Sequence, residues 1–447
     1  MAAATLASLG RRVILLERLS RPGQKLLATG GGRCNLAHDL APAAFIRAFS
    51  RNHAPVARFI APAIHHFPPA KIRQWFHDRG VPTCVQPDGC VYPVSNSSRD
   101  ILDALLRACD HPLVELRTHT RVINITPNVA QASRAAPRFQ LTTTNAAGVV
   151  ETLCGGSLIL ATGGCSCSPL GADPSILKIL ANLGLAIVPP VPALVPLVVD
   201  KTQTALLSLA GLTLENARVA WQGSASATDG AVLFTHRGLS GPAILEISRD
   251  FPNPQIPKSP NPQIPKSPTL QISTCAARGW NDWQTLFASW RVSRGATFLR
   301  NLLSGEIPRP WAAFLCDAAG LPASVTAARA TRGNLDALAT ALTALPIPIS
   351  ETEGWSRAMV TRGGVALHEL DPQTLRCHRF PFLHCIGDGI DNRVCDCLLG
   401  RNFIVRRIFY IYFIGDFNRI VQYHTRPFDT GGRRSNQFTD RAFGKQV

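Results

Sequence analysis

The first part of the chain alternates short apolar runs with stretches in which apolar residues recur at helical spacing. The run Val13–Leu16 is apolar and partly β-branched, which predicts a strand buried on both faces, as in a parallel sheet. Glycine and polar residues separate the segments that follow, and Ser97 or Ser98 is expected to cap the third helix. The predicted helices are 54–64, 70–79 and 98–109, and the predicted strands are 89–93, 114–116, 121–125, 139–144, 149–153 and 157–160.

The pattern changes at the proline-punctuated stretch 189–197, which predicts a crossover into a second domain. There Ser240 is expected to cap a helix that opens with Pro242, and His236 is interpreted as a turn residue rather than a catalytic one. Two copies of PNPQIPKS start at Pro252 and Pro260, and proline this dense predicts a surface loop. The other predicted elements here are strands 219–221 and 232–235 and helices 283–303 and 334–345.

Candidate chemistry follows the first strand. Glu17 ends it, and an acid at such a strand tip can accept a hydrogen bond from a ribose hydroxyl. Gly30, Gly31 and Gly32 precede Arg33; consecutive glycines let the backbone approach a ligand, and the guanidinium suits a phosphate. A plain surface turn is the alternative, but the acid-tipped strand favours a nucleotide site.

Residues 15–36, LLERLSRPGQKLLATGGGRCNL, resemble the segment after the second strand in the aminoacetone oxidase family of FAD-binding proteins. These NAD(P)/FAD-dependent oxidoreductases belong to the glutathione-reductase-like flavoprotein class. Further resemblances are VYPVS at 91–95, ATG at 161–163, PALVPL at 192–197, LFTHRGLSGP at 233–242, MVTRGGV at 359–365 and the strand that ends in Gly387-Asp388.

The resemblance implies bound FAD and hydride transfer through the flavin. It places Glu17 on the adenosine ribose, the Val122 backbone on the adenine, and Asp388, where the family usually has Glu, on the ribityl chain. Cys34 has no second cysteine a few residues away, so a thiol relay is not expected. Catalytic residues stay unassigned. The predicted cofactor-binding residues are Glu17, Arg18, Lys25, Gly30, Gly31, Gly32, Arg33, Cys34, Asn35, Val122, Ala161, Thr162, Gly163, Gly387 and Asp388.

A chain of 447 residues is long for one core, so more than one domain is expected. The predicted class is α/β: a discontinuous Rossmann-like FAD-binding domain with an inserted β-barrel-like and helical domain. The predicted parts are 1–188 and 355–400 for the FAD domain, 189–354 for the inserted domain with a loop at 252–268, and 401–447 for a basic tail. The expected substrate is a small molecule. The family name implies an amine, and the choice between NAD(P)H and oxygen as the second reactant is left open.

Composition narrows the partners. The net charge of +17 fits nucleic acid or an anionic membrane, but no nucleic-acid motif accompanies it, and the last 47 residues hold nine Lys and Arg against three Asp. Nucleic acid is therefore not expected as a partner. The thirteen cysteines form no C-x-x-C pair, which argues against zinc ribbons and thioredoxin-like redox motifs and fits reduced thiols in the cytoplasm. No metal is expected. No apolar run reaches the roughly 18 residues of a membrane span.

Both ends of the chain depart from the family pattern. Counting back about 20 residues from Glu17 passes Met1, so the glycine-rich turn and first strand of a dinucleotide fold are expected to be missing. The match also decays after Asp391, and the tail is not expected to form the family's terminal helix. The chain as written is thus expected to fold poorly and bind FAD weakly. A degraded, non-catalytic flavoprotein is the alternative to an active enzyme.

Overall fold

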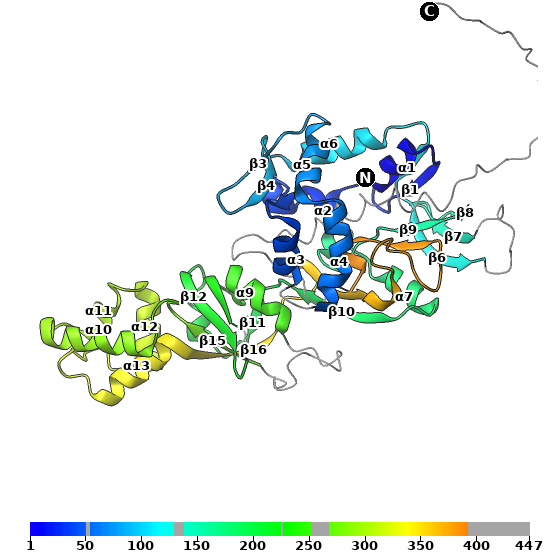
Figure 1. Cartoon of the computed structure of the whole chain (residues 1–447). Coiled ribbons are helices and arrows are strands. Elements are labelled where there is room, and N and C mark those ends of the chain that lie inside the picture. The colour runs from blue at the N-terminus through cyan, green and yellow to red at the C-terminus, as the bar shows by residue number, and fades with distance from the viewer. Residues whose placement is uncertain (51–53, 129–137, 225–226, 252–267, 392–447) are drawn as a thin grey trace, which may run out of the picture.

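The computed structural model describes residues 1–50, 54–128, 138–224, 227–251 and 268–391. Two bodies lie side by side, and the second is inserted in the sequence of the first (Figure 1). Each body has its own large apolar core. The predicted class, an α/β nucleotide-binding fold with an inserted antiparallel barrel and helices, is confirmed. The predictions for the tail 401–447 and for nearly all of the loop 252–268 lie outside the described residues.

Two pairs of parallel strands form the base of the first body. Strand β1 (Val13–Leu16) pairs with β5 (Val114–Arg117), and β9 (Leu158–Leu160) pairs with β18 (Leu383–Cys385). Within the described part of the chain no strand links one pair to the other. The prediction that β1 is buried on both faces is wrong, because Ile14 is 37% exposed and none of the other three strand residues is fully buried.

Helices cover these strands. Helix α1 (Ala2–Ser8) packs on β1 and on α6 (Ser98–Cys109). Ser97 occupies the N-cap position of α6 without a side-chain cap bond, and the buried Ser98 hydroxyl donates to the Leu27 carbonyl (3.0 Å). The neighbouring elements are α2 (Gln24–Leu27), the 3₁₀ turn η1 (Thr29–Gly32), β2 (Ala37–His38), α3 (Pro42–Ser50), α4 (Ala54–His66), α5 (Pro69–His77), β3 (Thr83–Val85) and β4 (Cys90–Pro93).

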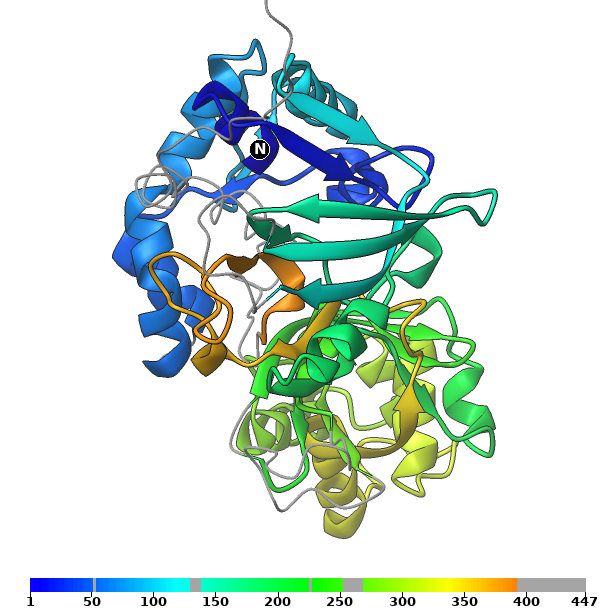
Figure 2. The same ribbon diagram turned by 90° about the vertical axis from the view of Figure 1, so that its right-hand side faces the viewer.

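Antiparallel strands complete the first body. A meander of β6 (Arg121–Pro127), β7 (Phe139–Thr144) and β8 (Val150–Gly155) lies beside β9 (Figure 2). The first part of the predicted crossover 189–197 lies in β10 (Ile187–Ala193), a strand that pairs with β17 (Val360–Val365), and the chain enters the barrel at Leu197. The prolines of β10 are tolerated because this strand pairs on one side only and its register shifts between Val188 and Val191. Helix α7 (Ser175–Asn182) packs against β6, β10 and β17.

The inserted body is a closed barrel with helices at one end. Its strand order is β11-β14-β13-β12-β15-β16, every neighbour antiparallel. The strands are β11 (Leu197–Val199), β12 (Thr213–Trp221), β13 (Ala227–Thr235), β14 (Gly238–Ser240), β15 (Thr269–Ser273) and β16 (Leu345–Thr352). The helices are α8 (Thr204–Leu207), α9 (Pro242–Ile247), α10 (Trp280–Ser293), α11 (Leu299–Leu303), α12 (Arg309–Ala318) and α13 (Arg332–Ala344).

Two helix predictions for this body need correction. The predicted helix 283–303 is two helices, because the chain leaves α10 at Arg294, whose non-helical backbone is followed by Gly295. Helix α9 is capped by Gly241 rather than Ser240. Gly241 has φ 93°, and a Cβ there would lie 2.7 Å from the Ala231 carbonyl oxygen, so the position favours glycine on two grounds.

Candidate flavin-binding site

Glu17 stands at the carboxyl end of β1, where the strand meets β5 and β6. Its backbone N–H donates to the Arg117 carbonyl (2.8 Å), and its carbonyl accepts from Thr120 N–H (2.9 Å). Carboxylate oxygen Oε1 accepts from Leu19 N–H (2.8 Å), while Oε2 has no hydrogen-bond partner among the described residues. The carboxylate is thus held by one oxygen and can offer the other to a ligand.

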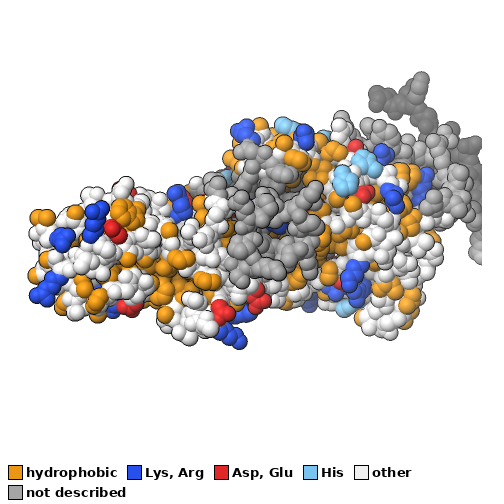
Figure 3. All heavy atoms as spheres, turned by 90° about the horizontal axis from the view of Figure 1, so that it is seen from below, with side chains coloured by type: hydrophobic (Ala, Val, Ile, Leu, Met, Phe, Trp, Pro, Cys, Tyr) orange, Lys and Arg blue, Asp and Glu red, His pale blue; other side chains and the backbone are white. Residues whose placement is uncertain are grey.

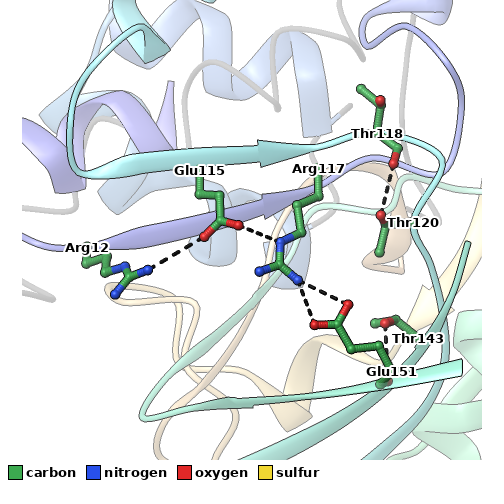
Figure 4. A network of polar contacts seen from close by, with 7 residues as sticks. All are labelled: Arg12, Glu115, Arg117, Thr118, Thr120, Thr143 and Glu151. Atoms are coloured by element: carbon green, nitrogen blue, oxygen red, sulfur yellow. Dashed lines mark hydrogen bonds and ion pairs between the residues drawn. The ribbon is translucent and has the colours of Figure 1, made fainter.

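A network of charges braces this strand tip from the side (Figure 4). Arg117 Nε donates to Glu115 Oε1 (2.7 Å), and Arg117 also pairs with Glu151 on β8 (3.0 Å). Arg12 lies 3.7 Å from the other oxygen of Glu115. The hydrogen bond from Arg117 lowers the pKa of Glu115. The network ties β5 to β8 and so fixes the backbone that holds Glu17.

Arg18 and Val122 lie at the same end. The Arg18 guanidinium donates to the Gly171 carbonyl (2.6 Å). Val122 lies two residues after Thr120, whose backbone N–H donates to the Glu17 carbonyl. Asp173 pairs with Arg121 (2.7 Å). Burial alone would raise the pKa of Asp173, but hydrogen bonds from Ser175 and the two arginines lower it overall. Three predicted residues, Glu17, Arg18 and Val122, therefore share one neighbourhood.

The triple glycine makes an open, left-handed turn. Gly30, Gly31 and Gly32 have φ angles of 56°, 65° and 88°, which favour glycine at all three positions. A Cβ at Gly31 or Gly32 would meet no atom within 4 Å, so this backbone faces open space. Arg33 is exposed and stacks over the Tyr92 ring (4.4 Å). A backbone without side chains beside a cation is suited to an anionic ligand.

Lys25 joins this first segment to the loop after β9. Its Nζ lies 3.5 Å from Ser166 Oγ, at the limit of a hydrogen bond. Burial raises the pKa of Cys165 to about 11, and the nearby Lys25 ammonium opposes that rise. The N–H groups of Cys165 and Ser166 both donate to Thr361 Oγ1 on β17, at 2.8 and 3.1 Å.

The loop after β9 also touches the turn after β18. Ala161 and Thr162 are exposed, and Gly163 turns the chain with φ 75°. A Cβ on Gly164 would lie 2.4 Å from Thr361 Oγ1 and 3.0 Å from the Asp388 carbonyl oxygen, so the contact permits no side chain. Gly387 has φ 78° and opens the 3₁₀ turn η5 (Gly387–Gly389).

Two buried polar side chains in this region have unpaired atoms. Asp388 is 4% exposed, and its Oδ1 has no hydrogen-bond partner. Asn35 is 2% exposed, and neither its amide nitrogen nor its oxygen forms a hydrogen bond of good geometry, although the Cys90 thiol lies beside it. Leaving such groups unpaired costs about 1–3 kcal/mol each. These residues fit a bound ligand that carries hydroxyl and ring hydrogen-bonding groups, as FAD does.

The structure brings three segments distant in sequence to one place: 17–35, 161–166 and 387–388. Cys34 belongs to this region as a buried residue with φ 58°. Sequence reasoning missed Thr361 and Ser166, the residues that fasten the segments together. Thr361 is a polar residue in β17, a strand in which every residue is buried, and a buried hydroxyl needs a hydrogen-bond partner. That was the available signal of a role for Thr361.

A discontinuous α/β body with these strand tips and an inserted six-strand barrel defines a flavoprotein of the FAD-dependent oxidoreductase class. The model of the HI0933-like protein Rossmann domain matches residues 1–395, and the chain belongs to this family.

The chain is similar to two proteins with different activities. The chain is 28% identical over 396 residues to the ribosomal RNA dihydrouridine synthase of Escherichia coli (strain K12), covering 88% of this chain and 89% of that protein. It is 23% identical over 382 residues to the 3-dehydro-bile acid delta(4,6)-reductase of Clostridium scindens, covering 85% and 87%. A solved quinol-fumarate reductase aligns with 97% of this chain and 70% of that chain, at 14% identity and a TM-score of 0.44.

Within the part of the chain that the structure describes, no helix combines the length and apolar character that a membrane crossing requires. No group of three or more His, Cys, Asp or Glu in the described ranges is arranged to hold a metal ion. The eleven cysteines described there are free thiols.

Proposed function

We propose that this protein is an FAD-dependent reductase that adds two hydrogens across an electron-poor carbon–carbon double bond, and that uridine in ribosomal RNA is its substrate. The observation that carries the flavin chemistry is the buried Asp388, whose unpaired Oδ1 lies in the turn that packs on Gly164. The named relatives support the reaction type, since one makes dihydrouridine and the other is a reductase. The E. coli relative and the net charge of +17 favour RNA over a small amine.

Nine of the predicted residues have a proposed task. Glu17 would accept from the adenosine ribose through Oε2, and the Val122 backbone would lie against the adenine. Gly30–Gly32, with Lys25 and Arg33, would line the pyrophosphate. Asp388 would accept from the ribityl chain, and Asn35 would pair with the ring. When bound, FAD supplies the hydride that one ring carbon of the substrate accepts, while the neighbouring carbon gains a proton; NAD(P)H is proposed as the source of that hydride.

The reaction is tested with the purified chain, FAD, NADPH and ribosomal RNA that lacks dihydrouridine. Nucleosides from the digested RNA are analysed by mass spectrometry, and a uridine heavier by two hydrogens is expected. Asp388→Asn should lose the flavin absorbance and the product together. Glu215→Gln is the matched control, because it makes the same acid-to-amide change at an exposed position on β12. Tight FAD binding with no change in the RNA would reject uridine as the substrate.

A further inference from the structure

The helical end of the inserted body carries exposed arginines around an exposed aromatic ring. We propose that Arg291, Arg294, Phe298 and Arg329, termed here the arginine face, dock the RNA substrate. This inference rests on the proposed function, because it takes RNA as the substrate and adds where the protein grips it.

Backbone contacts hold the arginine face together. Arg291 and Arg294 lie at the end of α10, and the Arg291 guanidinium donates to the carbonyls of Ala328 and Ala330 (3.4 Å each). Ala328 N–H donates to the Gly295 carbonyl (2.9 Å), and the site of a Gly295 Cβ lies 3.2 Å from Ala328 Cβ. The loop that carries Arg329 is therefore fixed against the end of α10.

The charges of this face are not neutralised. Three other arginines of the helical end have acidic partners: Arg278 pairs with Glu306 (2.8 Å), Arg300 with Asp317 and Arg332 with Asp336. Arg291, Arg294 and Arg329 are exposed and form no ion pair within the described residues. Unpaired guanidinium groups on a rigid corner are suited to phosphates, which release counterions when they bind.

Phe298 adds a ring to the same corner. It is 45% exposed, and its backbone is fixed by a β-bridge to Thr326 and by the bond from Leu299 N–H to the Val325 carbonyl (2.9 Å). Figure 3 shows Lys and Arg side chains interspersed with apolar ones at the helical end of the molecule. An exposed aromatic ring among arginines is the arrangement on which single-stranded bases stack.

The position of the arginine face selects the kind of RNA. Helices α10 to α13 lie at the opposite end of the molecule from α1 and β1 (Figure 1). An RNA held at this face must extend along the barrel to reach the flavin-binding site. The substrate is therefore an extended or folded RNA rather than a nucleoside or a short oligonucleotide.

The test measures binding and turnover separately on the FAD-loaded full chain. Fluorescence anisotropy with a labelled, uridine-containing ribosomal RNA fragment, without reductant, gives Kd as a function of KCl. Arg294→Glu/Arg329→Glu should weaken binding at least tenfold and reduce the slope of log Kd against log[KCl] by about 1.5–2, because two phosphate contacts are lost. Phe298→Ala should weaken binding about fivefold or more with little change in slope.

The matched control is Arg99→Glu/Lys178→Glu, which makes the same change in net charge at two exposed positions of the first body. It should bind RNA within about threefold of wild type, and unchanged melting temperatures should show that both double variants fold. Equal loss in the two double variants, or wild-type affinity in Arg294→Glu/Arg329→Glu, overturns the proposal. The proposal is also overturned if Arg294→Glu/Arg329→Glu loses binding to phosphatidylserine vesicles but keeps its affinity for RNA. If the face binds RNA but wild type makes no dihydrouridine, only the proposed reaction fails.

Discussion

The two bodies of this protein differ in how completely their strands are paired. In the barrel every strand has a neighbour on both sides, and three tryptophans, Trp221, Trp283 and Trp311, are almost fully buried. In the first body the parallel strands form two separate pairs, so each described pair keeps unpaired edges. The proposed cofactor residues lie at the tips of these strands. The site is thus built where pairing is least complete, beside a body whose pairing is complete.

This difference suggests a division of labour. A closed barrel buries its backbone bonds and apolar area in one unit, so its stability does not depend on a ligand. The first body leaves Asp388 and Asn35 with unpaired buried atoms, and a ligand that pairs them would add stability there. Four measurements separate these two behaviours.

The largest effect is expected inside the barrel body. Trp311 is fully buried, packs on Phe234 (5.1 Å between ring centroids) and donates to Thr274 Oγ1 (3.0 Å). Trp311→Ala should lower the free energy of unfolding by about 3–5 kcal/mol. Urea unfolding measures the loss, with the partly exposed Trp280→Ala as control. A similar loss in both variants would mean that burial in this body does not set stability.

Ligand binding should act on the other body. FAD at about 100 times its Kd should stabilise the protein by about 2.7 kcal/mol, since only the folded state binds it. Hydrogen exchange followed by mass spectrometry should show slower exchange in segments 13–19, 29–36 and 383–391. Segments 213–221 and 269–273 of the barrel should be unchanged. Uniform slowing across both bodies would contradict the division.

A substitution of Glu17, at the end of β1, tests one proposed contact with FAD. Glu17→Ala should weaken FAD binding by about 1.5–3 kcal/mol, because a ribose hydroxyl would lose a charged acceptor. Glu215→Ala removes an exposed carboxylate from β12 and serves as control. Titration of the apoprotein with FAD by flavin fluorescence gives both affinities. Unchanged affinity in Glu17→Ala would remove Glu17 from the site.

The smallest effect is expected at the open edge of β1. Ile14 is 37% exposed, so Ile14→Ala should cost under about 1 kcal/mol of unfolding free energy. The matched change in the barrel, Ile272→Ala, removes the same groups from a fully buried position and should cost about 2–5 kcal/mol. Equal costs in thermal or urea unfolding would show that β1 is covered in solution.

Local patterns predicted many of the elements and the left-handed glycine turn. The strand runs, the amphipathic helix of residues 98–109 and the glycines at 30–32 depend on nearest neighbours, which a sequence displays directly. The contacts that join distant segments at the site could not be predicted in that way. Thr361 binds two amides almost 200 positions earlier in the chain, and no local pattern encodes a partner at that separation.

The wrong predictions have the same origin. The apolar run of β1 is compatible with burial on two faces, but burial depends on which elements pack above and below the strand, and Ile14 is left 37% exposed. Only Gly295 marks the end of α10 in the sequence, and the apolar spacing continues past it to Leu303, so the break was not predicted. The assigned cofactor residues and the domain boundaries stay predictions for the experiments above.

The pairing of β10 with β17 has a consequence for how the inserted body could be removed or exchanged. The inserted body is entered after Ala193 and left before Val360, and these two residues are direct partners across antiparallel strands. Leu197 and Thr352, at the base of the barrel, are partners as well. Such neighbouring termini are what a module needs in order to be cut out or exchanged without redirecting the host chain. Residues 194–359 could thus be replaced by a tight turn between two strands, and the same two ends could carry the barrel into another protein.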